Sequence, residues 1–300
     1  MEKRNSFHIF ALISVVGWSI SYVLTRMALR HFSPYSLGFL RYIIASAVLA
    51  AIACAFSISP PARKDWGLIA ASGATGFFLY MIALNTGSMT ETAATNSIII
   101  ATAPIMTTLL GMILYGEKLV SAQWFAIAVE FVGIMILNVR DGNFSVGAGI
   151  FWLLLAAFLL SVFNLLQRKL TKTYTGLRVS IYSIFAGTVM LSAFVREAVE
   201  EAASADAKYL VYAALLGIFS SALSYVAWSV AIERAPRTSS ASNYMFLTPL
   251  LAAVMGFVIA GELPDSGTLI GGAVILSGVF LFNRAGRPPQ TPANGKTAGG

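Results

Sequence analysis

The sequence predicts an all-α membrane protein with ten transmembrane helices, arranged as two inverted five-helix repeats. Composition, block length and an internal repeat carry this prediction. Charged residues make up 11% of the 300 residues and hydrophobic residues 57%, whereas a soluble protein has about 25% charged residues. The apolar residues form blocks close to the roughly 20 residues that span hydrocarbon. The alternating segments of about 10 residues that are typical of a membrane barrel are not seen.

Turn and charge signals divide the apolar residues into ten blocks, each with ends uncertain by roughly 2–4 residues. The blocks cover 6–30, 34–57, 65–87, 92–115, 120–139, 147–168, 177–196, 208–232, 238–260 and 265–283. The first block starts with charged residues, as a signal peptide does. It contains Trp18 and Tyr22 and has no clear small-residue cleavage site, so we expect it to be kept as the first span.

The distribution of Lys and Arg predicts the orientation. Ten spans place both termini on one side, and 14 of the 20 basic residues fall on that side, against 5 on the other, with Arg41 inside a span. Cytoplasmic segments of membrane proteins carry the excess of Lys and Arg. We therefore expect a multi-pass membrane protein with both termini in the cytoplasm.

The segments between the spans are short and exclude several functions. The longest, residues 197–207, is acidic and is expected to be an outside loop. No phosphate-binding G-x-x-x-x-G-K-[ST] sequence occurs, so ATP hydrolysis is excluded. The basic residues are scattered, which argues against nucleic acid as a partner. The single Cys54 lies in an apolar block, and residues 284–300 predict a disordered cytoplasmic tail.

A repeat relates the two halves of the chain. At a fixed offset of 145 residues the matching pairs are Tyr80–Tyr225, Pro104–Pro249, Gly111–Gly256, Gly116–Gly261, Glu117–Glu262, Gly133–Gly278 and Asn138–Asn283. Arg26 and Arg168 correspond near an offset of 142. Each half, 6–139 and 147–283, holds an odd number of spans and so inserts with opposite orientation. Such inverted repeats are typical of secondary transporters, which bind substrate between the halves near the midplane.

Short motifs carry a family resemblance. These are Gly17–Trp18, the stretch PYSLGFLR at 34–41 and the paired P…G…GE segments. They resemble the EamA type of the drug/metabolite transporter superfamily, and most closely its bacterial amino-acid exporter branch. The resemblance implies a ten-helix export carrier of the bacterial inner (plasma) membrane that works without a cofactor. The second half departs from the pattern, because Trp18 and Arg41 have no clear partners near positions 160 and 183.

Polar residues form a stripe along three of the predicted spans. The stripes consist of Ser14, Trp18, Ser21, Tyr22, Thr25 and Arg26, of Ser161, Asn164, Gln167 and Arg168, and of Ser221, Ser224, Tyr225 and Trp228. In lipid such faces are costly to expose, so we expect them to turn inward. The serines can serve helix packing alone. The aromatic residues lie mid-span and predict an aromatic cavity that suits apolar or aromatic groups.

The predicted substrate cavity combines aromatic rings with a few polar groups. Its candidate residues are Trp18, Tyr22, Arg41, Tyr80, Asn164, Tyr225, Trp228 and Asn243. Within this set Asn164 and Asn243 are the preferred contacts for an amino or carboxylate group. The two histidines, His8 and His31, lie at span ends, and no Cys/His cluster or H-E-x-x-H occurs. The sequence therefore predicts no metal and no cofactor.

Two ionisable residues lie inside predicted spans, Arg41 and Glu130. Arg41 can clamp a substrate carboxylate and Glu130 can carry a proton, or the two can form a buried structural pair. Glu130 shares a face with Ala122, Ala126 and Gly133, which predicts packing of this small-residue face against another helix. Glu117 and Glu262 follow glycines at helix ends and are expected to cap a helix or hold a loop.

Pro104 and Pro249 interrupt two apolar blocks. Each proline removes a backbone donor, which frees the carbonyl of Ile100 or Met245. Neighbouring threonines and helices can satisfy such groups in a membrane. The prolines are then either static kinks or hinges whose movement opens opposite faces.

These features favour a secondary carrier that exports amino acids, aromatic and other neutral ones, by alternating access. The alternative is an exporter of other amphipathic metabolites or drugs by proton antiport. An intramembrane enzyme would need a nucleophile–base or metal constellation, and a channel would show a filter motif or a pore built by several subunits. Neither is readable here. The expected partners are a small-molecule substrate and membrane lipid, with the chain as a monomer or a homodimer.

Overall fold

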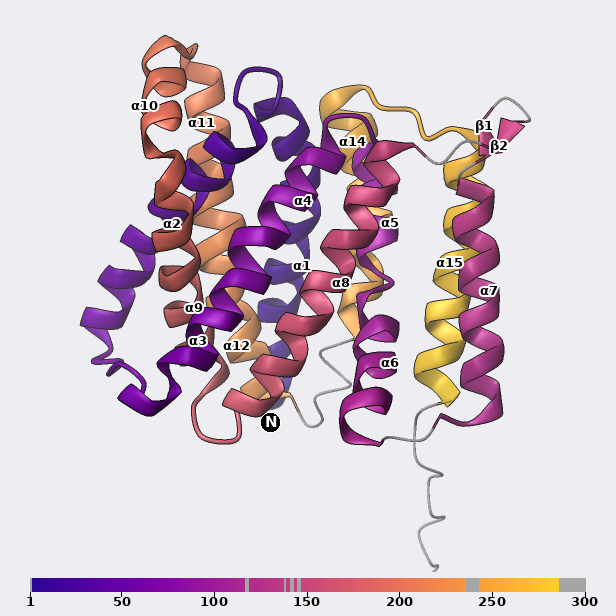
Figure 1. The fold of residues 1–300 in the computed structure, drawn as a ribbon, viewed down its shortest axis with the longest axis horizontal. Coiled ribbons are helices and arrows are strands. Elements are labelled where there is room, and N and C mark those ends of the chain that lie inside the picture. The colour runs from indigo at the N-terminus through magenta and orange to yellow at the C-terminus, as the bar shows by residue number, and fades with distance from the viewer. Residues whose placement is uncertain are drawn as a thin grey trace, which may run out of the picture.

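The computed structural model describes residues 2–116, 119–137, 139–140, 143–144, 147–235 and 243–285. The described residues form a bundle of helices that run between two opposite sides of the molecule (Figure 1). The exception is a hairpin of two-residue strands, β1 (Val139–Arg140) and β2 (Asn143–Phe144). The predicted all-α class is confirmed.

Several helices in each half are broken or change their winding. The first half consists of α1 (Glu2–Ala28), α2 (Pro34–Ala55), η1 (Arg63–Asp65), α3 (Trp66–Gly73), η2 (Ala74–Phe78), α4 (Leu79–Ser88), α5 (Ala93–Ile100), α6 (Ala103–Tyr115) and α7 (Ser121–Leu137). The second half consists of α8 (Ala148–Leu170), α9 (Gly176–Leu191), η3 (Ser192–Phe194), α10 (Val195–Ser204), α11 (Ala207–Leu215), η4 (Leu216–Leu223), α12 (Ser224–Arg234), η5 (Asn243–Phe246), α14 (Leu247–Ala260) and α15 (Ser266–Ala285).

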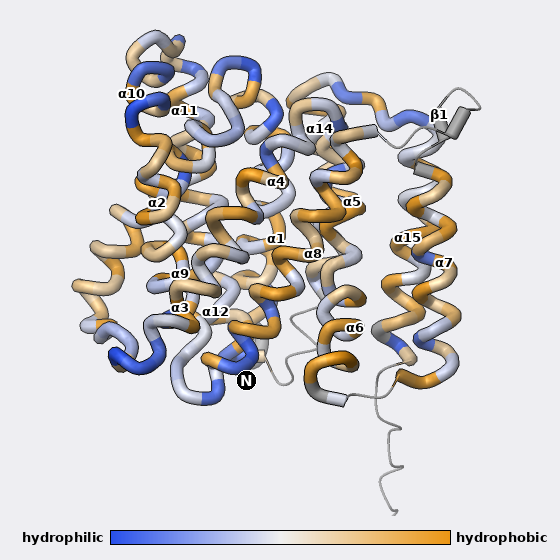
Figure 2. Tube along the Cα trace, viewed as in Figure 1, coloured by the Kyte–Doolittle hydropathy of each residue, from blue (hydrophilic) through white to orange (hydrophobic). Residues whose placement is uncertain are grey.

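Joined end to end, these pieces give the ten predicted spans. Within the described ranges, seven helical spans of 22 to 29 residues are long and apolar enough to cross a membrane, and three shorter apolar helices complete the set. Figure 2 shows the hydrophilic segments at the two ends of the bundle and the apolar ones between them. Large apolar side chains such as Phe131 and Phe257 point outward, as hydrocarbon-facing residues do.

The expected outside loop at 197–207 is wrong in its conformation. Residues 195–204 form α10, which continues the seventh span past a single 3-10 turn. Its sequence is rich in Ala and Glu, which favour helix, and Arg196 pairs with Glu200 one turn later. Glu201 accepts a hydrogen bond from the backbone nitrogen of Ser33 at 2.9 Å, which anchors α10 on the turn between α1 and α2.

Both prolines lie at the start of a helix rather than in the middle of one. Pro104 is the second residue of α6, after a turn at residues 101–102 separates α6 from α5. Pro249 is the third residue of α14, after the 3-10 segment η5. Backbone N–H groups in the first turn of a helix have no helical partner, so a proline there removes no helical hydrogen bond. At Pro104 the predicted kink is a break between two helices, and at Pro249 it is a change from 3-10 to α-helical winding within the described residues.

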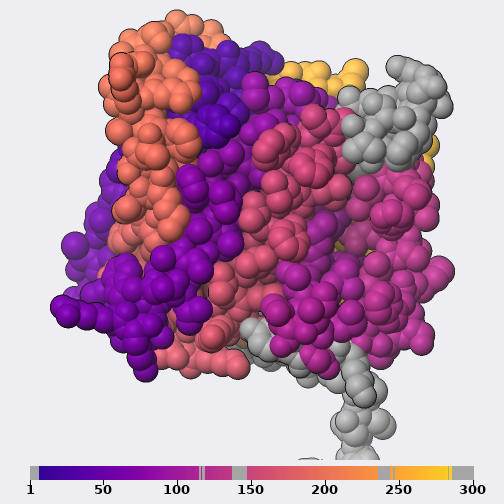
Figure 3. Space-filling view, viewed as in Figure 1, coloured from indigo at the N-terminus to yellow at the C-terminus, as the bar shows by residue number. Residues whose placement is uncertain are grey.

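The first helix of each half packs on the other half. α1 contacts α12 and α14, whereas α8 contacts α4, α5 and α6. Figure 3 shows α8 in pink beside the purple of α4, with a hollow between α8 and the magenta of α6 and α7. The two halves thus share one core and do not form separate bodies.

α7 and α15 run antiparallel and pack on each other (Figure 1). A Cβ added to Gly278 would stand 3.0 Å from the backbone nitrogen of Glu130, and one added to Gly133 would meet Ile275 at 2.6 Å. Ile275 is the repeat counterpart of Glu130, so the contact is nearly symmetric. The predicted small-residue face of α7 therefore packs on α15, although Ala122 at its start is exposed.

The end of the chain differs slightly from the prediction. α15 includes Arg284 and Ala285, two residues past the predicted end of the last span. The rest of the predicted tail, residues 286–300, lies outside the described residues.

Candidate functional site

Aromatic rings from both halves meet in the middle of the bundle. The ring of Trp18 on α1 lies 5.6 Å from that of Tyr225 and 5.3 Å from that of Trp228, both on α12. The Tyr225 ring also contacts Phe77 at 5.7 Å. Trp18, Tyr225 and Trp228 are half-buried. Spacings and angles of this kind stabilise aromatic pairs.

Phe77 links the aromatic cluster to further rings. Its centroid lies 5.5 Å from Tyr42 and 5.2 Å from Phe163. Tyr22 and Tyr80, which the sequence placed in the cavity, belong with Tyr225 to the same hydrophobic core. Tyr22 is buried and Tyr80 half-buried. The structure therefore brings together Trp18, Tyr22, Tyr80, Tyr225 and Trp228.

Two π-helical segments place residues of the aromatic cluster. η2 carries Phe77 and is followed within two residues by Tyr80, whereas η4 carries Ser221 and is followed by Tyr225. A π segment widens the helix by one residue per turn and rotates the side chains that follow it, and such segments are frequent at functional sites. The third span of each half contains one. No sequence signal predicted them.

Arg41 on α2 lies beside the aromatic cluster, with 5% of its surface exposed. Its Nε donates a hydrogen bond to the Ser221 hydroxyl on η4. Its guanidinium carbon stands 5.7 Å from the Tyr42 ring centroid, and Nη1 faces the sulfur of Met81 at 3.9 Å. Arg41 therefore joins α2 to η4 and α4.

Glu130 lies elsewhere, in the contact between α7 and α15. It is buried, and its Oε1 has no hydrogen-bond partner among the described residues. Among the described residues, the contacts of Arg41 are with Ser221 on η4, Met81 on α4 and Tyr42 on α2, and none is with α7. The alternative of a buried Arg41–Glu130 pair is therefore wrong, because the two side chains lie in different helix contacts.

The structure describes the side chain of only one of the two predicted asparagines. Asn164 on α8 donates to the Thr107 hydroxyl on α6 at 3.4 Å, which places it at the contact between these helices. Asn243 begins η5, and its side chain lies outside the described residues. Their predicted role as contacts for a substrate group stays a prediction.

Two buried serines bind the first turns of the helices that carry the prolines. The Ser19 hydroxyl on α1 lies 3.2 Å from the carbonyl oxygen of Thr248, and the Ser161 hydroxyl on α8 lies 2.9 Å from that of Ala103. Thr248 and Ala103 each directly precede a proline. The serines correspond at an offset of 142 and the acceptors at 145, so the two contacts are equivalent. Each crosses from one half to the other.

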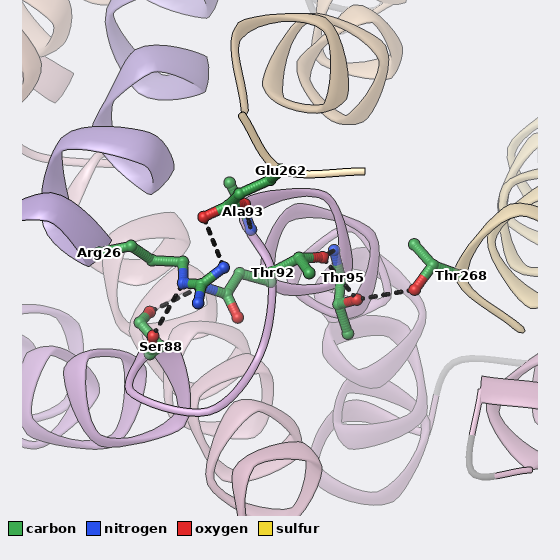
Figure 4. Close-up of polar contacts among 8 residues, drawn as sticks. Arg26, Ser88, Thr92, Ala93, Thr95, Glu262 and Thr268 are labelled. Carbon is green, nitrogen blue, oxygen red and sulfur yellow. Dashed lines mark hydrogen bonds and ion pairs between the residues drawn. The ribbon is translucent and has the colours of Figure 1, made fainter. Parts of the chain in front are cut away.

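An ion pair joins the halves on the side where α1 ends (Figure 4). Arg26 binds the Glu262 carboxylate, and its Nε donates to the carbonyl of Ser88 at 3.2 Å. The second oxygen of Glu262 accepts from the backbone nitrogen of Ala93 at 2.9 Å, in the first turn of α5. Next to it, the hydroxyls of Thr95 and Thr268 lie 3.1 Å apart. The four contacts connect α1, α4 and α5 with the segment around α14 and α15.

The Gly–Glu pair explains how Glu262 reaches this position. Gly261 ends α14 with φ +67°, a left-handed conformation that glycine adopts at low cost. The chain then turns, and the Glu262 carboxylate points back to α5, where an anion is favoured at a helix N-terminus. Its predicted role in capping a helix is confirmed, whereas its pairing with Arg26 was not predicted. Glu117, its counterpart, lies outside the described residues.

The fold and these contacts define a polytopic helical membrane protein with a buried aromatic and basic site between two interlocked halves. The model of the EamA-like transporter family matches residues 5–139 and 147–284. The chain belongs to the EamA-like transporter family and is a transporter. This confirms the resemblance that the short motifs indicated.

Curated relatives cover nearly the whole chain. A protein of Streptantibioticus cattleyicolor named "Probable terminal-alkyne amino-acid exporter" is 33% identical, over 91% of this chain and 92% of the relative. "Uncharacterized transporter YdfC" of Bacillus subtilis is 28% identical, over 93% and 92%. "Probable amino-acid metabolite efflux pump" of Salmonella typhimurium is 22% identical, over 94% and 95%. A solved crystal structure shares the fold, with a TM-score of 0.63 and 20% identity over 93% of this chain and 96% of that chain.

The Arg26–Glu262 pair is expected to stabilise the fold. Glu262→Ala should lower the free energy of unfolding in detergent by about 1–3 kcal/mol, because it removes two bonds to a mostly buried carboxylate. Arg26→Met should lower it by less, and the double variant by less than the sum of the two. A double-mutant cycle measured by denaturant titration checks this coupling.

The exposed pair Arg196–Glu200, with side chains 91% and 66% exposed, is the matched control. Its removal should leave the free energy of unfolding unchanged within error. Additive effects of Glu262→Ala and Arg26→Met would contradict the interpretation of this contact as a coupled pair.

Proposed function

We propose that the protein is a secondary carrier that exports amino acids, aromatic and other neutral ones, by alternating access. The aromatic cluster beside Arg41 carries this proposal, because it offers apolar ring faces and one fixed positive charge inside the membrane bundle. Such a site suits the side chain and the carboxylate of an amphipathic metabolite. Two relatives whose names contain amino-acid exporter and amino-acid metabolite efflux pump support the substrate class.

We place the chain in the bacterial inner membrane with both termini in the cytoplasm. The excess of Lys and Arg on the side of the termini supports this orientation. The N-terminus lies at the lower side in Figure 1, so the Arg26–Glu262 pair at the other end of α1 would face outward. The outward-pointing apolar side chains would contact lipid, and the chain would work as a monomer or a homodimer.

The carrier would consist of two inverted repeats, 6–139 and 147–283, followed by a cytoplasmic tail. Two separate matches to the family model support the division. Figure 1 shows α6 ending at the lower side and α14 at the upper side. Both helices end at a glycine with φ +67°. Antiparallel packing of α7 and α15 supports the inversion as well.

Alternating access would use the breaks in the fourth span of each half. In this arrangement the Arg26–Glu262 pair holds the outer side closed. Opening that side requires the pair to separate while the serine contacts at Thr248 and Ala103 keep the halves together. Pro104 and Pro249, at the start of the moving helices, would act as hinges.

The proposed substrate cavity consists of aromatic and polar groups with few fixed charges. Its residues are Trp18, Tyr22, Arg41, Tyr80, Tyr225 and Trp228, with Asn164 and Asn243 as polar contacts at its margin. Ring faces accept many apolar side chains, so the selectivity should be broad.

A second candidate is export of other amphipathic metabolites or drugs by proton antiport. Glu130 favours it, because this acid is 4% exposed and its Oε1 has no hydrogen-bond partner among the described residues. Acids inside membrane spans frequently mark proton pathways. Against it, Glu130 packs on Gly278 in a contact between two helices. Its repeat counterpart is the apolar Ile275, so the second half carries no matching acid.

The transport activity can be tested in proteoliposomes. Purified protein should catalyse saturable counterflow of labelled L-phenylalanine without ATP. Trp18→Ala removes two ring contacts and should lower kcat/KM by about tenfold, since each aromatic pair contributes about 0.5–1.5 kcal/mol. Phe194→Ala, which removes the ring stacked on Tyr35 at 4.7 Å, is the matched control and should leave transport unchanged. Absence of counterflow for every amino acid and amine in a labelled panel would contradict the carrier proposal.

The hinge proposal concerns turnover. Pro104→Ala and Pro249→Ala should each slow transport several-fold while leaving the membrane level and the unfolding temperature intact, because a continuous helix bends less readily than a broken one. Transport rates per molecule, with expression measured in parallel, check this. Unchanged turnover in both variants would end the hinge proposal.

Glu130→Gln separates the two driving forces. If the carrier is facilitated, this variant should move substrate down its gradient at the wild-type rate, with or without a pH gradient. Loss of pH-driven flux together with intact gradient-driven flux would instead establish proton antiport through Glu130. Flux measured in the same vesicles under the two conditions decides between them.

A further inference from the structure

Arg41 is a buried cation whose described surroundings contain no counter-charge. The groups near it are the Ser221 hydroxyl, the Met81 sulfur and the rings of Tyr22, Tyr42, Tyr80 and Tyr225. All of them are neutral side chains, contributed by α1, α2, α4, η4 and α12. No carboxylate of the described residues forms an ion pair with Arg41. A lone cation inside a membrane bundle is costly, and such residues normally have a partner.

The donors of Arg41 are only partly used. A guanidinium has five N–H donors in a rigid planar fork. Within the described residues, Nε binds the Ser221 hydroxyl, and Nη1 faces a thioether, which is a weak acceptor. The fork therefore has donors left for a stronger acceptor. A carboxylate matches this geometry, since its two oxygens can accept two parallel N–H bonds.

The same surroundings offer little to an ammonium group. Two acids that could attract an ammonium group are engaged elsewhere: Glu262 pairs with Arg26, and Glu130 packs on α15. Ring faces can attract a cation weakly, but the Arg41 charge repels a second cation placed near it. The recognition is therefore asymmetric: one strong feature for a carboxylate and none for an amine.

We propose that Arg41, positioned by Ser221, binds the carboxylate of the substrate, and that the site accepts monocarboxylates with an apolar or aromatic group whether or not they carry an α-amino group. This proposal rests on the proposed function and specifies its substrate class. Amino acids, 2-oxo acids and 3-arylpropanoates would then share the site. Amines without a carboxylate would be excluded.

Binding to the wild-type full chain in detergent tests the proposal without any substitution. The probes are L-phenylalanine, 3-phenylpropanoate and phenethylamine, followed by tryptophan fluorescence and by the unfolding temperature. The dissociation constant of 3-phenylpropanoate should lie within about tenfold of that of L-phenylalanine. Phenethylamine should bind at least about 20-fold more weakly, since a hydrogen-bonded charge contributes this much or more. Equal binding of phenethylamine and 3-phenylpropanoate, or no binding of either carboxylate, would overturn the proposal.

Arg41→Lys and Ser221→Ala separate ligand binding from a purely structural role. Arg41→Lys keeps the charge but loses the planar fork, so it should weaken both carboxylates about tenfold or more and leave the weak binding of phenethylamine unchanged. Ser221→Ala should weaken the carboxylates by less. Arg196→Gln on the surface of α10 is the control. A structural role would instead lower the unfolding temperature and weaken all three probes alike, which would overturn the proposal.

Transport in proteoliposomes distinguishes the carrier function from the carboxylate site at Arg41. Uptake of labelled 3-phenylpropanoate alongside L-phenylalanine supports both. Carboxylate binding without transport of either compound would contradict the carrier function while supporting the Arg41 site. Transport of L-phenylalanine with no binding or transport of 3-phenylpropanoate would leave the carrier function standing and overturn the inference.

Discussion

A buried hydroxyl inside a membrane bundle must find an acceptor, because hydrocarbon supplies none. Ser19 and Ser161 meet this constraint at the boundary between the two halves. Each hydroxyl lies 2.7 Å from the carbonyl four residues earlier in its own helix. It is also within reach of a carbonyl of the other half that directly precedes a proline. Both serines are fully buried. These contacts fix the first helix of one half to the broken fourth span of the other, and the rest of the arrangement depends on that exchange.

Two different kinds of contact hold the two halves of the bundle together. The serine contacts lie at the starts of α6 and α14, inside the bundle, and are formed in equivalent ways in both halves. The Arg26–Glu262 pair lies at one end only, and it is partly accessible, with 24% and 16% of the side chains exposed. In the proposed carrier, the interior contacts of neutral groups would persist while the hydrated ion pair at the rim separates at modest cost. This physical difference would permit a rocking motion around a fixed interior.

The site lies inside the bundle, where aromatic, hydroxyl and basic side chains from several helices come together. η4 places Ser221 against Arg41, and Phe77 on η2 contacts the ring of Tyr225, which follows η4. The two segments come from opposite halves. A substrate carboxylate bound by Arg41 would contact α2 and η4 directly, and its side chain would lie against rings of α1 and α12. Binding would therefore involve both halves at once, which is how a ligand can shift the balance between two arrangements of a carrier.

Hydrophobic block length was sufficient to predict the ten spans, and the mid-span positions of Trp18, Tyr225 and Trp228 pointed to rings that do meet. The small face around Ala126 and Gly133 predicted the packing of α7. Other features depend on information that is absent from the local sequence. The π segments are the example, because they have no residue signature. The helix α10 is a different case: its Ala and Glu residues favour helix, but its acidic composition was interpreted as a loop.

Contacts between distant segments were the least predictable. Arg26 and Glu262 are 236 positions apart in the sequence, and their pairing depends on the turn that Gly261 makes. The Arg41–Glu130 pair followed from similar depths of the two residues in the membrane. It fails because depth does not specify which face of the bundle a helix occupies.

A distance measurement across the side of the bundle where α1 ends tests most directly whether the Arg26–Glu262 pair holds the two halves closed there. Spin labels on Met89→Cys and Leu263→Cys, both exposed positions, with Cys54→Ser to remove the single native cysteine, report the separation of the halves near the Arg26–Glu262 pair. The account predicts one short distance without substrate and a second, longer population when L-phenylalanine is added or when Glu262→Gln weakens the pair. A single distance that neither substrate nor Glu262→Gln changes would contradict it.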